Sequence, residues 1–181
     1  NWYLDGNNAS VVSSDGNKTT VQMGSGYRGD LWLARSGKGK IVNVTPADYR
    51  YFAIKVGFKS QLVPGKNKPN GCIKLEIFDD GIKKIGPEYF GTGGDANNRY
   101  EILGASEIST TEPNVLYYDL QSKYKTVTPT DWNQVFDLSQ CKFVIADFPE
   151  TAQTYDLYWI RSFKSIEELQ AFVDSENNTN E

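Results

Sequence analysis

The sequence predicts an all-β protein, specifically a jelly-roll β-sandwich that ends in a short C-terminal helix. About ten short strand-like segments follow one another, and turns rich in Gly, Pro, Asn and Asp separate them. Strands do not alternate with helices and no internal repeat is present, so a parallel α/β fold is not expected. Near residue 164 the spacing of apolar residues changes from that of a strand to that of a helix.

Length and composition narrow the range of functions. The 181 residues predict a single domain at 1–173, followed by a polar tail at 174–181. The 19 basic and 23 acidic residues argue against a nucleic-acid-binding surface and against a polybasic membrane patch. No apolar run approaches the roughly 20 residues of a transmembrane helix. Because the chain contains no His, a Ser-His-Asp or Cys-His catalytic site and a His-ligated zinc are excluded.

The N-terminal third is expected to consist of short strands and tight turns. Asp5-Gly6-Asn7-Asn8 reads as the first turn, and Ser14-Asp15-Gly16-Asn17 reads as the tip of a β-hairpin. The strands expected in this part of the chain are 2–4, 9–13, 18–23, 27–34 and 41–44.

The middle of the chain contains the clearest half-buried strand, at 51–58. Its even-numbered apolar residues share one face, while Tyr51, Ala53 and Lys55 lie on the other. Further strands are expected at 72–78, 82–85, 100–103, 114–120 and 143–146. Long loops are expected at 86–99 and 121–134.

The C-terminal stretch predicts a buried strand and then a helix. Residues 155–163 carry apolar side chains on both faces, as an interior strand does: Leu157, Trp159 and Phe163 on one face, Tyr158 and Ile160 on the other. Ser165 and Glu168 form a capping-box pattern that begins a helix. The apolar stripe of this helix comprises Ile166, Leu169, Phe172 and Val173. Trp159 is expected to be a core residue rather than a platform for a ligand.

The two cysteines leave two alternatives open. Cys72 and Cys141 form a disulfide if their strands are neighbours, or they remain free and buried. Two cysteines without a framework spacing are weak evidence for a disulfide, so free thiols are favoured.

Sugar binding is the chemistry that the two long loops suggest. A sugar ring stacks its apolar face on Tyr or Trp, and its hydroxyls bond to Asn, Asp, Gln and Arg. These residue types meet in both loops, and the predicted carbohydrate-binding residues are Tyr89, Asn97, Asn98, Arg99, Tyr124 and Trp132. A structural alternative exists for the aromatic residues, since Trp132 can anchor its own loop and Tyr89 can cover one end of the sandwich.

Catalysis is not predicted, and neither is a cofactor. A glycosidase needs two facing carboxylates, and the nearest candidates, Glu76 and Asp79, fall on opposite faces of their strand. A structural calcium ion is the one metal left open, because Asp5–Asn8 and Asp95–Asn98 offer oxygen ligands. Turn formation explains the same residues without a metal.

Two C-terminal segments resemble a known family. Residues 158–169, Tyr-Trp-Ile-Arg-Ser-Phe-Lys-Ser-Ile-Glu-Glu-Leu, and residues 135–139, Val-Phe-Asp-Leu-Ser, are similar to those of bacterial surface lipoprotein domains with a galactose-binding-like jelly roll. Such domains belong to the glycan-acquisition systems of gut bacteria, and many are regarded as sugar-binding proteins.

The resemblance implies a non-catalytic carbohydrate-binding domain whose partner is an oligo- or polysaccharide. It also implies an extracellular or outer-membrane location, with a lipid anchor attached through an N-terminal segment that has been removed. The alternatives are an interaction module that binds other surface glycan-uptake proteins and, less favoured, a glycoside hydrolase.

Overall fold

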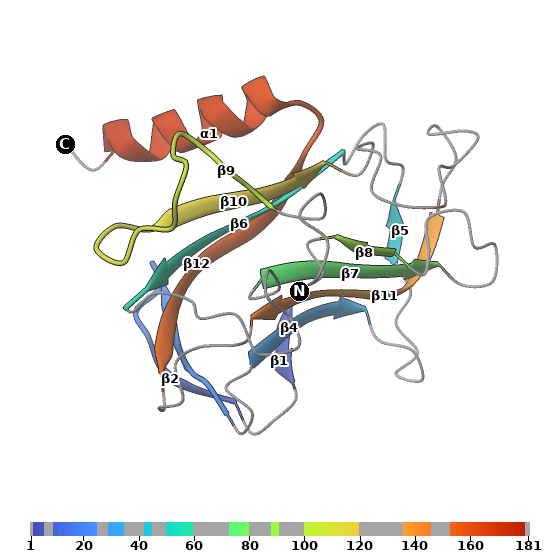
Figure 1. The fold of residues 1–181 in the computed structure, drawn as a ribbon, viewed down its shortest axis with the longest axis horizontal. Helices are drawn as coiled ribbons and strands as arrows, with labels where there is room; N and C mark the ends of the chain where they lie inside the picture. Colours follow the sequence, from blue (N-terminus) through green and yellow to red (C-terminus); the bar gives the residue numbers. More distant parts are fainter. Residues whose placement is uncertain are drawn as a thin grey trace.

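The computed structural model describes residues 2–5, 9–24, 29–34, 42–44, 50–59, 73–79, 88–90, 100–119, 136–145 and 153–179. Within these ranges the chain forms two antiparallel sheets and one C-terminal helix, α1 (Figure 1). The predicted all-β sandwich with a C-terminal helix is therefore confirmed. No helix in the described part of the chain is long and apolar enough to span a membrane.

The two sheets contain six strands each among the described residues. Sheet A has the order β1 (Tyr3–Asp5), β4 (Gly29–Ala34), β11 (Phe136–Ile145), β7 (Ile73–Asp79) and β8 (Glu88–Phe90), and β5 (Val42–Val44) also pairs with β11. Sheet B has the order β2 (Ser10–Ser14), β3 (Thr19–Gln22), β12 (Thr154–Phe163), β6 (Tyr51–Phe58), β10 (Asn114–Asp119) and β9 (Glu101–Ile102). The chain crosses repeatedly between the sheets: β6, β10 and β12 lie in sheet B, whereas β7 and β11, which come between them in the sequence, lie in sheet A. This is the connectivity expected of a jelly roll.

The main core lies between the sheets, and its inward residues follow the predicted alternation of β6. Phe52, Ile54, Val56 and Phe58 are all buried in it. Sheet A faces them with Ile73, Leu75, Cys141, Phe143 and Ile145. A hydrogen bond joins the sheets across this core: the Tyr118 hydroxyl of β10 donates to the Ile73 carbonyl of β7 at 3.0 Å.

The hairpin that the sequence predicts near residue 15 is present between β2 and β3. Asp15 Oδ1 accepts hydrogen bonds from the backbone N–H groups of Asn17 and Lys18, both at 2.9 Å. Gly16 has a φ of 89°, which a residue with a side chain adopts only at a cost. The Asp-Gly pair therefore builds this turn.

A β-bulge in β12 corrects the predicted faces of that strand. The register with β6 shifts between Leu157 and Trp159, so that the simple alternation breaks at Tyr158. As a result Leu157 packs with Ile160 against the main core, whereas Trp159 packs against the helix. A bulge inserts one residue without changing composition, which is why the sequence pattern missed it.

Helix α1 (Ile166–Thr179) lies across part of the outer face of sheet B, so the molecule has three layers (Figure 1). A second core forms beneath it from Ala53, Val115 and Leu169. The predicted cap is present, since Ser165 Oγ accepts from the Glu168 N–H at 3.2 Å. The Glu168 carboxylate accepts in return from the Lys164 N–H, at 3.0 Å.

Several predicted boundaries differ from the structure. The helix continues through Thr179, so most of the predicted tail at 174–181 is helical. Strand β11 begins at Phe136 rather than at 143, and β8 lies inside the segment 86–99 that was predicted to be a loop. The predicted strand at 82–85 lies outside the described residues.

Cys141 has a free thiol and is fully buried in the main core. Burial raises the pKa of this thiol well above its ordinary value. Cys72 lies outside the described residues. The favoured alternative, a free thiol, therefore holds for Cys141.

Candidate functional site

The residues predicted to bind carbohydrate lie almost entirely outside the described part of the chain. For Tyr89 the backbone is described, in β8 opposite Glu76, which places it on an edge strand of sheet A. Its side chain and the other predicted residues are outside the description: Asn97, Asn98, Arg99, Tyr124 and Trp132. The same holds for the oxygen ligands of both predicted calcium loops. These assignments stay predictions.

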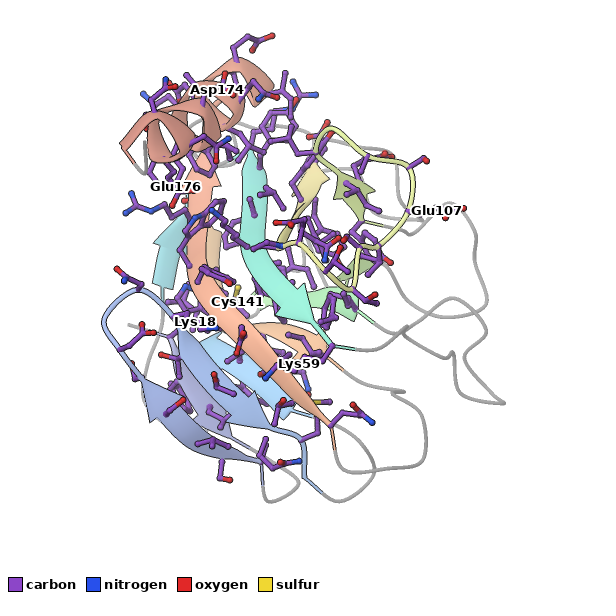
Figure 2. All side chains as sticks on the ribbon, turned by 90° about the vertical axis from the view of Figure 1, so that its left-hand side faces the viewer. Lys18, Lys59, Glu107, Cys141, Asp174 and Glu176 are labelled. Carbon is purple, nitrogen blue, oxygen red and sulfur yellow. The ribbon has the colours of Figure 1, made fainter. Side chains whose placement is uncertain are left out.

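The described residues contain a different candidate, on the outer face of sheet B beyond the C-terminal part of α1. Inward side chains alternate along β6, so Lys55 and Gly57 face outward. Figure 2 looks onto this side of the molecule, with Glu176 just beneath the helix, Lys18 beside the β2–β3 hairpin and Lys59 after the end of β6. We call this region the open face, and its residues are Lys18, Thr20, Lys55, Gly57, Lys59, Asp156, Tyr158 and Glu176.

Asp156 forms the first polar centre of the open face. Its carboxylate accepts a hydrogen bond from Thr20 Oγ1 at 2.6 Å and one from Lys18 Nζ at 2.8 Å. Burial is the largest single influence and pushes the pKa of Asp156 up, but these hydrogen bonds and the charges of Lys18 and Lys59 together lower it below 3.8. Asp156 is therefore ionised at neutral pH, and it orients Lys18.

Glu176 forms the second polar centre, at the border of the helix. Its carboxylate accepts from the Trp159 indole N–H at 2.9 Å and from Lys55 Nζ at 3.1 Å. The Lys55 ammonium also lies 5.5 Å from the centroid of the Tyr158 ring, within the range of a cation–π contact. Lys55 thus connects the helix to the aromatic residue of the open face.

Tyr158 lies between the two polar centres and is partly exposed. It occupies the β12 bulge and faces the glycine of the neighbouring strand, Gly57. A methyl group added to Gly57 would lie 3.6 Å from both Tyr158 Cε2 and Asp156 Cβ. These are ordinary van der Waals distances, so the Tyr158 ring lies directly beside the backbone of β6 at Gly57.

The open face offers groups for hydrogen bonding and for contact with a ring. Where a shift of a carboxyl pKa is resolved among the described residues, it is downward, as for Asp15, Asp156 and Glu167. The arrangement presents an aromatic ring, three lysines and two hydrogen-bonded carboxylates, those of Asp156 and Glu176, on one surface.

Sequence reasoning missed the open face because its members are far apart along the chain. Lys18 and Asp156 meet only because β3 pairs with β12, and no local pattern indicates that pairing. Tyr158 was expected on the face opposite Trp159, and only the bulge changes this. The one signal in the sequence was Asp156 itself, a carboxylate between Tyr155 and Leu157 in a strand predicted to be buried, because a buried carboxylate requires partners.

Comparison with known proteins identifies a family but not a function. The family model of DUF4979, a domain of unknown function, matches residues 1–169, so the chain belongs to this family. No curated protein and no solved structure matches the chain significantly.

Proposed function

We propose that this member of the DUF4979 family is a non-catalytic carbohydrate-binding domain, and that the open face of sheet B takes part in binding. The observation that supports the proposal most directly is the position of Tyr158, a partly exposed ring between two ordered charge clusters. Aromatic and charged groups combined in this way match the two chemical aspects of a sugar.

A sugar ring presents an apolar C–H face and a rim of hydroxyls. Tyr158 offers an apolar surface for the first. Lys18 and Lys59 offer N–H donors, and Asp156 offers an acceptor, for the second. Because Lys18 and Thr20 already hold Asp156 in place, little side-chain entropy is lost when a ligand binds.

The resemblance to surface lipoproteins of glycan-acquisition systems supports the finer parts of the proposal. These are an extracellular or outer-membrane location, a lipid anchor, and a plant or host oligo- or polysaccharide as the ligand. The loop residues predicted from the sequence, such as Tyr89 and Trp132, are proposed to extend or supplement the open face.

The test is a glycan array followed by titration calorimetry with soluble polysaccharides. Tyr158→Ala is expected to weaken binding at least about tenfold, which corresponds to about 1.4 kcal/mol. Tyr3→Ala is the matched control, because Tyr3 is also a partly exposed tyrosine on a strand but lies in sheet A. Both variants are first compared with the parent by thermal unfolding, so that loss of fold is recognised.

A third variant separates the two candidate locations. Trp132→Ala tests the predicted loop site, and Tyr158→Ala tests the open face. If only Trp132→Ala weakens binding, the domain binds sugar but not through the open face. If no glycan binds across the panel, the proposed function is wrong.

The interaction module remains as the alternative, and one observation favours it. Strand β2 at the edge of sheet B is exposed along its whole length and carries two exposed valines. The glycoside hydrolase stays the less favoured alternative, and the release of product from a chromogenic glycoside would test it.

A further inference from the structure

Among the described strands, β2 forms the edge of sheet B on the side of the hairpin. It pairs with β3 on one side, and every one of its residues is exposed. Val11 and Val12 are 56% and 60% exposed, and they are the large apolar residues found exposed in the described part of the chain. An edge strand of this kind offers unpaired backbone N–H and C=O groups together with apolar side chains.

The strands at the other ends of the two sheet orders, β1, β8 and β9, are protected in ways that β2 is not, and β5, which among the described strands pairs with β11 alone, has only three residues. Strands β1, β8 and β9 have three, three and two residues, and each contains an acidic residue: Asp5, Glu88 and Glu101. Short length and charge are the usual devices that prevent edge-to-edge pairing. Strand β2 has five residues, Ser-Val-Val-Ser-Ser, and none is charged.

We propose that β2 pairs with β2 of a second copy of this chain, in antiparallel orientation, to form a symmetric dimer. The charge pattern favours this partner and this edge. In a symmetric antiparallel pair each strand meets its own sequence, so an acidic edge such as β1 or β9 would bring like charges together. A strand of serine and valine meets itself without that penalty, and Val11 and Val12 lose exposed apolar surface.

The β2 bulge sets the expected strength of the dimer. Register with β3 shifts between Val11 and Ser13, and a bulge interrupts a regular ladder. Only a short segment is therefore available to the second copy. We expect a weak dimer that dissociates on dilution, rather than an obligate one.

Dimer geometry has a consequence for binding, which rests on the proposed carbohydrate-binding function. An antiparallel strand pair has its two-fold axis perpendicular to the sheet, so the outer faces of both copies of sheet B lie on the same side. Two open faces would then be presented in one plane. A polysaccharide chain that contacts both would bind more tightly than a single oligosaccharide does, by the effect of multivalency.

Sedimentation velocity across a concentration series tests the dimer without any sugar. The parent is expected to move from one chain to two as its concentration rises. Val12→Lys is expected to raise the dissociation constant of the dimer at least about tenfold, because two lysines then meet near the symmetry axis. Ser106→Lys adds the same charge in an exposed loop away from β2 and is expected to leave the dimer unchanged.

Cross-linking identifies the strand directly. In a Cys72→Ser background, single cysteines are placed at each of positions 10–14, and Cys141 stays buried. Oxidation is expected to link two copies efficiently at one or two of these positions, those nearest the two-fold axis. A parent that stays monomeric at every concentration overturns the proposal, and so does a dimer that Val12→Lys leaves intact.

Failure of the dimer and failure of sugar binding are distinguishable. Monomeric Val12→Lys is expected to bind a short oligosaccharide as the parent does, and to lose only the extra affinity for a polysaccharide. If the parent dimerises through β2 but binds no glycan, the proposed interface is supported and the proposed carbohydrate-binding function is wrong. If short and long glycans lose affinity equally in Val12→Lys, the multivalent consequence is wrong.

Discussion

The indole N–H of Trp159, in the last strand, donates a hydrogen bond of 2.9 Å to the carboxylate of Glu176, in the C-terminal helix. The Trp159 ring also contacts Phe172 of the helix, with ring centroids 5.3 Å apart. Lys55 reaches the same carboxylate from β6. This contact explains why the helix continues past Val173 into a segment that reads as a polar tail.

Glu176→Ala is expected to destabilise the protein by about 1–3 kcal/mol, because it leaves the partly buried Trp159 N–H and the Lys55 ammonium without this acceptor. Asp174→Ala is the matched control. It removes an acidic residue from the same part of the helix, but Asp174 is exposed and bonds only to Gln170 among the described residues (Figure 2). Thermal unfolding of both variants decides the matter, and equal losses would show that the Trp159 contact adds nothing.

Asp156 is expected to make the folded protein less stable as the pH falls through the acidic range. Its pKa in the folded protein lies below 3.8, so the unfolded chain takes up a proton first as the pH falls. The stabilisation is complete at neutral pH and is lost as the pH drops below about 4, through the lowered folded pKa.

Asp156→Asn tests this dependence by urea unfolding at pH 7 and at pH 3. The variant should lose about 1–2 kcal/mol at pH 7 and less at pH 3, where Asp156 of the unfolded parent chain is already largely protonated. Glu107→Gln removes the same charge from an exposed loop and should behave as the parent does at both pH values. A loss of equal size at both pH values would contradict the assignment.

Replacing Tyr with Phe is expected to change the free energy of unfolding differently at Tyr155 and at Tyr118. Both are fully buried in the main core. The Tyr118 hydroxyl donates to the Ile73 carbonyl, whereas the Tyr155 hydroxyl has no hydrogen-bond partner among the described residues. Burial, with a smaller contribution from the nearby charge of Asp30, raises the pKa of Tyr155 well above its ordinary value.

Tyr118→Phe is therefore expected to cost about 1–2 kcal/mol, and Tyr155→Phe is expected to be neutral or slightly stabilising. The free energy of unfolding in urea provides the measurement for both variants. A cost at Tyr155 as large as that at Tyr118 would reveal an acceptor for its hydroxyl.

Lys142 and Asp30 form a buried ion pair on sheet A, with Nζ and Oδ2 3.2 Å apart. Removing one member leaves the other charge buried, so Lys142→Met is expected to cost about 3–5 kcal/mol. Adding Asp30→Asn should recover part of this loss, because the double variant no longer buries the Asp30 charge without Lys142. A double-mutant cycle measures the coupling, and additive effects of the two changes would exclude it.

Local patterns predicted most of the strands, because each depends on residues close in the sequence. The alternation of 51–58 places Phe52, Ile54, Val56 and Phe58 inward, as observed. Asp15 and Gly16 define the β2–β3 turn by their own chemistry. The Ser165–Glu168 pair likewise marks the start of α1.

Features that depend on pairing were not predictable in this way. A register shift at Tyr158 redistributes the side chains of β12 between two cores, and it leaves no mark on composition. Strand β8 gains its structure from pairing with β7, although its surroundings are rich in glycine. The open face likewise unites residues of β3, β6, β12 and α1, which no local pattern brings together.

The sequence by itself determined the all-β class, the terminal helix and the inward faces of strands such as β6, since these follow from periodicity and turn chemistry. Tertiary structure decided which strands are neighbours, and therefore which polar groups meet. Trp159 shows the division most clearly. Its burial was predictable from its size and its apolar neighbours in the sequence. Its hydrogen-bond acceptor, Glu176, is determined by the position of the helix on the sheet.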